Sequence, residues 1–189
     1  MLLATIAANN QFVSFEAMKS WLKLPAYSKL WVEGPYIDFN RNEIWRRIKE
    51  TPLNEHLLFI DIDIVFTPED VAKIEEHLNN GLDAVGGVYL IGKPPKDPCI
   101  FERLEGDYKL TPVKEGLNEV DAIGTGFLGI NAKVIKNMPD NPFSYLKEGE
   151  ITHGEDISFC HRLREQGFKL WCDSSIKLGH VRTQPIYGN

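Results

Sequence analysis

The sequence predicts an α/β domain with a mainly parallel central sheet, and three observations support this fold class. Strand-like apolar runs recur through the first 92 residues, helix-length segments separate them, and acidic residues directly follow one of the strands. Because strands that alternate with helices form βαβ units, they are expected to lie parallel in one sheet. A chain of 189 residues, 43% of them hydrophobic, can bury one core, so we expect a single domain over residues 1–189.

The first half of the chain carries the clearest elements. Four predicted strands cover residues 2–8, 29–33, 56–63 and 83–91, and three predicted helices cover residues 14–24, 40–50 and 67–80. The last helix has the strongest signals, because Thr67 and Asp70 can form a capping box and Gly81 follows the final turn. Apolar residues at helical spacing are Phe15, Met18, Trp21 and Leu22 in the first helix, and Val71, Ile74 and Leu78 in the last.

The second half changes character after a loop at residues 92–98. The expected elements are a β-hairpin, a glycine-rich strand, a helix and a final strand, at residues 99–113, 119–131, 154–167 and 168–173. The glycines suit a strand that another backbone or a ligand approaches closely. We expect the tail, residues 174–189, to be irregular. The tryptophans expected in the core are Trp31, Trp45 and Trp171.

Composition narrows the class of protein. The formal net charge of −6 argues against a general nucleic-acid binder, which would carry a basic surplus. Three cysteines without metal-type spacing do not indicate a disulfide framework, and this favours a reducing compartment. No apolar run is as long as a membrane span, and the apolar stretch at the start is too short for a signal peptide. We therefore expect a cytoplasmic protein with no membrane span and no nucleic-acid partner.

Two aspartates, Asp61 and Asp63, directly follow the third strand in the segment HLLFIDIDIVFTPED. A buried carboxylate without a partner is costly, so both side chains are expected to reach water, a cation or a reacting group. In parallel α/β sheets ligands bind beyond the carboxyl ends of the strands, where these residues lie. Two chemistries fit this position. One is a site for Mg²⁺ or Mn²⁺, which bind oxygen ligands and bridge to substrate phosphates, and the other is an aspartate nucleophile.

The aspartate-nucleophile alternative is a phosphatase. The letters DIDIV resemble the Asp-x-Asp motif of haloacid-dehalogenase-type phosphatases, in which Asp61 would be the nucleophile and Asp63 the general acid. That family also needs a later pair of separated acids to hold Mg²⁺. The comparable segment here, HGEDISF, has Glu155 and Asp156 side by side, and no acid follows three or four residues later. The metal-site interpretation is therefore favoured.

Five segments, in order along the chain, resemble glycosyltransferases of the GT-A fold, in particular small enzymes related to family 2. They are DFNRNEI, LLFIDIDIVFTPEDV, DAVGGVY, VDAIGTGFLGIN and GEDISFCHRLREQGFKLWCDSSIKLGHV. The resemblance implies a Rossmann-like α/β/α sandwich, with a nucleotide-binding half at residues 1–92 and an acceptor-side half at residues 93–189. It also implies an enzyme that moves a sugar from a nucleoside-diphosphate-sugar donor to a hydroxyl of a glycan, lipid or protein acceptor.

The same resemblance implies roles for the acidic residues. Asp61, Asp63 and His180 would form a site for Mn²⁺ or Mg²⁺ at the donor diphosphate, with Asp63 as the direct ligand and Asp61 acting through the ribose or the ion. Asp156 matches the catalytic base of inverting members, and Glu155 would hydrogen-bond the acceptor. The position of Asp156 near a helix N-terminus is expected to favour its ionised form.

The nucleotide-sugar site implied by the resemblance draws on several segments. Its residues would be Ala7, Asn9, Glu33, Arg41, Asp61, Gly126 and Arg182. The first three lie where the base and ribose usually sit, although this chain has AANN where the family usually has an acid. Arg41 would contact phosphate or anchor the Asp-x-Asp loop, Gly126 would bring backbone close to the sugar, and Arg182 would shield phosphate. Tyr89 and Trp171 are further candidates for the sugar site.

Simpler structural explanations remain open for these residues. Glu155 and Asp156 are also typical first-turn acids that complement a helix dipole. Arg41 would equally suit a solvated helix face together with Arg46 and Arg47. A third functional class also stays open, namely a non-catalytic module of the same fold that binds a nucleotide or a glycan without turnover.

Overall fold

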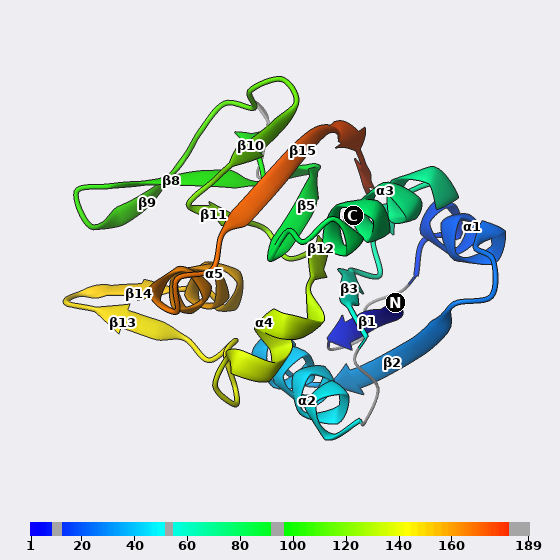
Figure 1. Cartoon of the computed structure of the whole chain (residues 1–189), viewed down its shortest axis with the longest axis horizontal. Helices are drawn as coiled ribbons and strands as arrows, with labels where there is room; N and C mark the ends of the chain where they lie inside the picture. The colour runs from blue at the N-terminus through cyan, green and yellow to red at the C-terminus, as the bar shows by residue number, and fades with distance from the viewer. Residues whose placement is uncertain (9–12, 52–54, 92–96, 182–189) are drawn as a thin grey trace, which may run out of the picture.

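The computed structural model in Figure 1 describes residues 1–8, 13–51, 55–91 and 97–181. Its centre is a seven-stranded sheet with the order β10-β15-β5-β12-β3-β1-β2. The strands are β1 (Leu2–Ala8), β2 (Ser28–Gly34), β3 (Leu57–Ile60), β5 (Ala84–Val88), β10 (Leu117–Glu119), β12 (Phe127–Ile130) and β15 (Leu170–Lys177).

The mainly parallel sheet predicted from the sequence is confirmed. Strands β2, β1, β3, β5 and β15 all point the same way, as their pairing shows. Two strands run against them, because β12 inserts antiparallel between β3 and β5, and β10 pairs antiparallel with β15. The predicted strand at residues 119–131 is in fact divided. Its first residue ends β10, β11 (Ala122–Ile123) leaves the central sheet and pairs with β8, and β12 returns to the central sheet.

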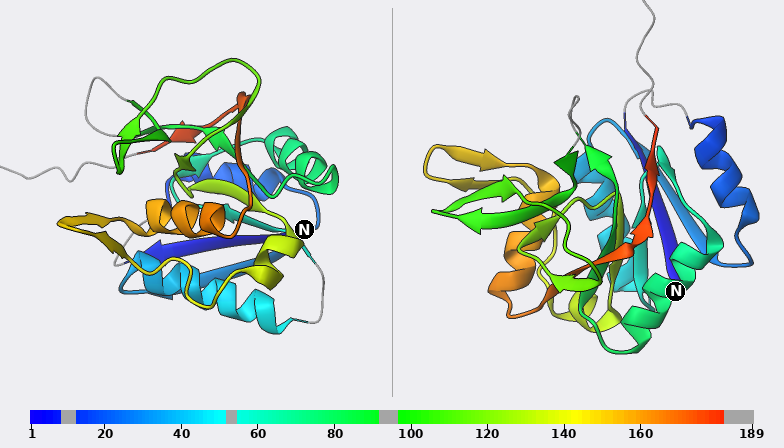
Figure 2. Two further views of the ribbon diagram at one scale, coloured as in Figure 1. Left: turned by 60° about the vertical axis from the view of Figure 1, so that its left-hand side comes forward. Right: turned by 90° about the horizontal axis from the view of Figure 1, so that it is seen from above.

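Helices cover both faces of this sheet (Figures 1 and 2). The helices are α1 (Phe15–Lys23), α2 (Ile37–Glu50), α3 (Pro68–Asn79), α4 (Ala132–Asn137) and α5 (Glu155–Glu165). Helix α3 packs against β5 and β12, while α2 packs against β1 and β2 and α5 against β11 and β15. The molecule is thus an α/β/α sandwich. Within the part of the chain that the structure describes, no helix is both long enough and apolar enough to cross a membrane.

Small strand pairs surround the sandwich. They are β8–β9 (Ile100–Leu104 and Asp107–Leu110), β13–β14 (Leu146–Glu148 and Ile151–His153), β16–β4 (Gly179–His180 and Ile64–Val65) and β6–β7 (Leu90–Ile91 and Asp97–Pro98). The hairpin β8–β9 agrees with the predicted one, whereas β13–β14 and α4 were not predicted. The expectation of an irregular tail is wrong for residues 174–180, because β15 continues to Lys177 and β16 pairs with β4.

The first helix differs most from its predicted packing. Phe15, Met18 and Leu22 are 71%, 44% and 75% exposed, and only Trp21 of the predicted apolar set is buried. The reason is that α1 packs at the rim of the sheet, against β4, and covers little of it. The Trp31 ring contacts that of Trp21 in a tilted arrangement, with centroids 5.3 Å apart, but Trp31 remains half exposed, so its predicted core position is wrong.

An aromatic cluster joins segments from both halves of the chain. Trp45 of α2, Phe59 of β3, Phe143 and Phe159 of α5 are all buried. The rings of Phe143 and Phe159 stack with centroids 4.5 Å apart, and Phe143 also meets the edge of Phe59 at 5.3 Å. Trp45 therefore lies in the core as predicted, whereas Trp171 is only partly buried. The cluster packs α2 against α5, because the Trp45 and Phe159 rings meet edge-on with centroids 5.7 Å apart, and it joins both helices to β3 through Phe143 and Phe59.

Helix α3 forms as its sequence predicts. The Thr67 hydroxyl accepts from the Asp70 N–H at 3.2 Å, and the Asp70 carboxylate accepts from the Thr67 N–H at 2.9 Å. The inward residues Val71, Ile74 and Leu78 are fully buried. They press on the centre of the sheet at Gly129, where a Cβ atom would lie 2.3 Å from Ile74 Cγ2.

This close approach makes Gly129→Ala a test of the helix–sheet packing. We expect the substitution to lower the free energy of unfolding by about 1–3 kcal/mol, because the new methyl group must displace α3 or distort β12. Urea denaturation of the purified protein measures the loss. Glu76→Ala on the exposed side of α3 is the matched control, with an expected change within about 0.5 kcal/mol. Equal stability of the two variants would contradict the packing described here.

Candidate active site

The two aspartates lie in a tight turn between β3 and β4. The Asp61 N–H donates to the Gly126 carbonyl at 2.8 Å, and the Ile64 N–H donates to the Asp61 carbonyl at 3.1 Å. Ile62, the residue between the aspartates, is 5% exposed. This burial anchors the turn in the core and leaves both carboxylates about 30% exposed, at the edge of the sheet where β1, β2 and β3 end.

Asp63 meets His180, which the short pairing of β16 with β4 brings alongside. The His180 Nε2 atom lies 3.1 Å from Asp63 Oδ2, and its Nδ1 atom lies 2.8 Å from the Leu90 carbonyl oxygen. Because a carbonyl oxygen can only accept, Nδ1 carries a hydrogen, and a neutral ring then presents the lone pair of Nε2 to the carboxylate. Two acceptors facing each other at this distance require a proton or a cation between them.

Asp61 is held by Arg41 of α2. The Arg41 Nη2 atom lies 2.9 Å and 3.2 Å from the two carboxylate oxygens of Asp61, and Nη1 donates to the Thr125 carbonyl at 3.4 Å. The Arg41 side chain is 3% exposed, and its Nε lies 3.7 Å from a carboxylate oxygen of Glu155. Burial acts to lower the pKa of Arg41, but the charges of Asp61 and Glu155 outweigh it and the pKa is raised, so the guanidinium stays charged.

The solvated-face explanation of Arg41 is therefore wrong. Arg46 and Arg47, in the same helix, do form exposed pairs with Glu43, whereas Arg41 points inward. Its guanidinium carbon lies 5.3 Å from the ring centroid of Phe59 and 6.0 Å from that of Phe143. The arginine thus links the aromatic core to the acidic turn.

Glu155 and Asp156 open helix α5 next to this arginine. Burial raises the pKa of both carboxyl groups, and the nearby Arg41 charge lowers the pKa of each only in part. The expected preference of Asp156 for its ionised form, argued from the helix N-terminus alone, is thus offset by burial, although its Oδ1 accepts from the Ile157 N–H at 2.7 Å. A carboxylate whose pKa is raised is a stronger base.

Tyr89 connects the glycine-rich segment to the histidine. The Gly126 N–H donates to the Tyr89 hydroxyl at 3.0 Å, and the Tyr89 ring meets the His180 ring edge-on at 5.3 Å between centroids. A Cβ atom at Gly126 would lie 2.8 Å from the Tyr89 hydroxyl and 3.1 Å from Asp61 Oδ2, so a side chain there would collide with the site. The hydroxyl of the neighbouring Thr125 is buried and has no hydrogen-bond partner among the described residues.

Of the remaining predicted residues, the structure brings two to the same edge of the sheet. Ala7 and Glu33 are paired in register at the ends of β1 and β2, beside the strand that carries the aspartates. Asn9 and Arg182 lie outside the described residues. Trp171, a candidate for the sugar site, is not brought to this edge, because it is the second residue of β15 and pairs with Val85 near the start of the parallel strand β5, with Lys169 over its ring.

A divalent cation fits the Asp63–His180 pair. Two ligands that each lie about 2.1 Å from one octahedral ion are about 3 Å apart when they occupy neighbouring corners, close to the observed separation. The described residues contain no cluster of three or more histidine, cysteine or acidic side chains placed to bind a metal. An ion held by this pair would need further oxygen ligands from water and from substrate phosphates, as Mg²⁺ commonly has.

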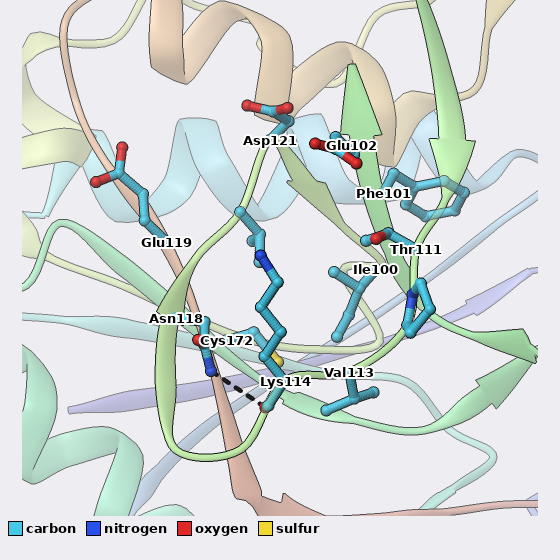
Figure 3. Close-up of a pocket in the computed structure, with 12 residues that line it drawn as sticks. Ile100, Phe101, Glu102, Thr111, Val113, Lys114, Asn118, Glu119, Asp121 and Cys172 are labelled. Carbon is cyan, nitrogen blue, oxygen red and sulfur yellow. Dashed lines mark hydrogen bonds between the residues drawn. The ribbon is translucent and has the colours of Figure 1, made fainter. Parts of the chain in front are cut away.

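Among the surface hollows of the described residues, two help to locate the candidate site. A cavity of about 260 Å³, shown in Figure 3, is lined by Ile100, Lys114 and Cys172 among others, and it shares no residue with the acidic cluster. A wider hollow of about 810 Å³ includes Tyr89 and Leu90 in its lining. This second hollow adjoins the candidate site, because those two residues contact His180.

Comparisons with known proteins place the fold. No protein-family model matches the sequence, and no curated protein matches it either. Among solved structures, A197 from STIV superposes with a TM-score of 0.72 and 19% identity, over 96% of this chain and 85% of that one. GalNAc-T7, crystallised with UDP, GalNAc and Mn²⁺, superposes with a TM-score of 0.63 and 11% identity, over 96% of this chain and 43% of that one. The protein thus has the GT-A fold and spans less than half of the GalNAc-T7 chain.

The raised pKa of Asp156 predicts a cost in stability. The folded state holds the proton more tightly than the unfolded state, so stability is greatest below the unfolded pKa and falls as the pH rises through the folded pKa. We expect Asp156→Asn to raise the free energy of unfolding by about 0.5–2 kcal/mol at pH 7, and the gain to shrink towards pH 4. Urea denaturation at both pH values measures it. Glu76→Gln, an exposed acid, is the control, and a gain independent of pH would contradict the assignment.

Proposed function

We propose that the protein is a metal-dependent glycosyltransferase that moves a sugar from a nucleoside-diphosphate sugar to an acceptor hydroxyl. The observation that carries this proposal is the meeting of Asp63 and His180, which are 117 positions apart in sequence, at the edge of the sheet where ligands of this fold class bind. The presence of UDP, GalNAc and Mn²⁺ in the GalNAc-T7 crystal supports a nucleotide-sugar donor and a divalent ion.

The donor side of the site would use the two aspartates differently. Asp63 and His180 would hold Mn²⁺ or Mg²⁺, and the cation would stabilise the negative charge of the departing diphosphate. Asp61 is fixed by Arg41 and would accept from the ribose, with Ala7, Asn9 and Glu33 towards the base. Gly126 would let the donor sugar approach the backbone, and Arg182 would lie over the phosphates.

The acceptor side would use helix α5. Asp156 Oδ1 is occupied by the Ile157 N–H, so Oδ2 would take the proton from the acceptor hydroxyl as that oxygen attacks the anomeric carbon from the side opposite the diphosphate. This geometry would invert the anomeric configuration. Glu155 would orient the acceptor, and the Arg41 guanidinium would compensate part of the negative charge of Glu155.

The phosphatase alternative has less support. Both carboxylate oxygens of Asp61 lie within hydrogen-bond distance of Arg41, and such a pairing weakens a nucleophile. A binding module without turnover is the remaining alternative. Localisation in the cytoplasm is part of the proposal and rests on the sequence alone.

A thermal-shift screen of nucleoside diphosphates tests the donor site. We expect at least one diphosphate to raise the melting temperature in the presence of Mn²⁺ and not in its absence, because a ligand that binds only the folded state stabilises it. Asp63→Ala should abolish this Mn²⁺-dependent shift. Asp140→Ala is the control, since its side chain is 83% exposed and pairs with Lys49, outside the proposed metal site. An undiminished shift in Asp63→Ala would rule out the proposed metal site.

Asp156→Asn separates chemistry from donor binding. Loss of a general base typically costs about 10²–10⁴ in rate, so transfer from a panel of nucleotide sugars should fall by that factor. The Mn²⁺-dependent shift with nucleoside diphosphate should persist, because Asp63 and His180 are unchanged. Wild-type turnover by this variant would show that another group is the base. Binding without turnover by the wild-type protein across the panel would favour the binding module.

A further inference from the structure

The outer edge of strand β2 is a surface with unused backbone hydrogen-bonding groups. Strand β2 ends the order of the central sheet on the side opposite to β10, and within the described residues no strand pairs with its outer edge (Figure 1). It is seven residues long, whereas β10 at the other edge has three residues. A long edge strand offers a row of N–H and C=O groups to another strand.

The common features that prevent edge pairing are largely missing from β2. Edge strands are usually protected by proline, by a bulge, by short length or by charges. The strand reads SKLWVEG, without proline, and its unbroken register with β1 shows no bulge. Its two charged residues, Lys29 and Glu33, have opposite signs and are both exposed, and the described residues provide neither with an ion-pair partner. These charges can therefore attract a strand of matching charge as well as repel others.

An exposed tryptophan lies between the two charges. Because side chains alternate along a strand, Lys29, Trp31 and Glu33 share one face of β2. Trp31 is 52% exposed, and its ring contacts that of Trp21 in α1, so this is the face beside α1. The helix adds three exposed apolar side chains at helical spacing along one side, namely Phe15, Met18 and Leu22. Exposed apolar surface next to an open strand edge is typical of an interaction site.

The sequence of β2 is complementary to itself. If two β2 strands pair antiparallel about a two-fold axis at Trp31, Lys29 of each copy lies opposite Glu33 of the other. The two Trp31 side chains then lie opposite each other, on the same face as both charge pairs. Directly opposite side chains in an antiparallel pair have Cβ atoms about 4.5–5.5 Å apart, which is close enough for ring contact and for ion pairing. The two-fold axis also closes the assembly at two copies.

We infer that the protein forms a symmetric dimer in which β2 pairs antiparallel with β2 of a second copy. The pairing continues the central sheet from one copy into the other and covers Trp31. The self-complementary charges favour a second copy over a lipid surface, because the net charge of −6 opposes binding to an anionic membrane. The inference does not depend on the proposed glycosyltransferase function. It does bring Lys29 of the second copy to Glu33, a residue of the proposed base site.

Sedimentation equilibrium over a series of concentrations tests the dimer. The wild-type protein should approach twice the chain mass of 21.5 kDa. Lys29→Glu places two carboxylates opposite each other in both pairs, and we expect it to raise the dimer dissociation constant about tenfold or more. Glu33→Lys should do the same with two ammonium groups, and it is assessed for oligomeric state alone. Lys147→Glu, which reverses an exposed charge on β13, is the matched control and should dimerise as the wild type does.

Mixing the two variants separates loss of pairing from loss of folding. In a heterodimer of Lys29→Glu with Glu33→Lys, both charge pairs are again complementary, so an equal mixture should dimerise more tightly than either variant alone. Trp31→Ala should weaken the wild-type dimer about tenfold, because a tryptophan at the centre of an interface usually contributes strongly.

Three results would overturn the inference. The first is a wild-type protein that stays monomeric at every concentration, and the second is a mixture that dimerises no better than its components. The third is binding of monomeric wild-type protein to lipid vesicles that is lost in Trp31→Ala, which would assign this surface to a membrane.

Discussion

The buried guanidinium of Arg41 is the interaction on which the candidate site depends. It joins the turn after β3 through Asp61, the glycine-rich segment through the Thr125 carbonyl and the start of α5 through Glu155. Without this cation, Asp61, Glu155 and Asp156 would share a partly buried region with no opposite charge, at a cost of several kcal/mol. Since the guanidinium also packs on Phe59, the charges of the site are positioned by the hydrophobic core itself. A fixed position in the core is what a preorganised catalytic site requires.

The same interaction explains why Asp61 and Asp63, with one residue between them, are paired with different side chains. Ile62 is buried between them and holds the turn in one position, so each carboxylate meets a different partner. Asp61 faces the fixed cation of Arg41, and its charge is largely compensated by the protein. Asp63 faces the imidazole of His180, whose Nδ1 hydrogen is bound to the Leu90 carbonyl, and its charge is left for a proton or a metal ion. Under the proposed function, a cation would therefore bind at Asp63 without disturbing the ion pair between Arg41 and Asp61.

The sequence predicts those parts of the fold and site that depend on neighbours along the chain. The capping box of α3, its inward face and the place of the aspartates after β3 are local, and the structure has them where the sequence puts them. The antiparallel direction of β12 and the two-residue strand β16 depend on distant partners and leave no local pattern. The sequence also did not indicate that Arg41 points inward. Arg46 and Arg47 in the same helix are solvated, and helical spacing alone did not distinguish Arg41 from them. For helix α1 the error is the reverse: the spacing of its apolar residues predicted a buried face, but most of these residues are exposed in the structure.

The two halves of the proposed metal pair differ in how firmly the fold holds them. Asp63 follows a fully buried strand, and its turn is fixed by backbone hydrogen bonds on both sides. His180 lies on a strand of two residues near the end of the described chain, and its place depends on Val181, on Leu90 and on Asp63 itself. Short segments with few backbone bonds open at low free energy, well before the core unfolds. A cation shared by the two side chains would add its binding energy to the closed arrangement alone, so metal affinity and the ordering of this segment are thermodynamically linked. In the proposed metal site, the rigid Asp63 would fix the position of the ion, and the ordering of His180 would set how tightly the ion is held.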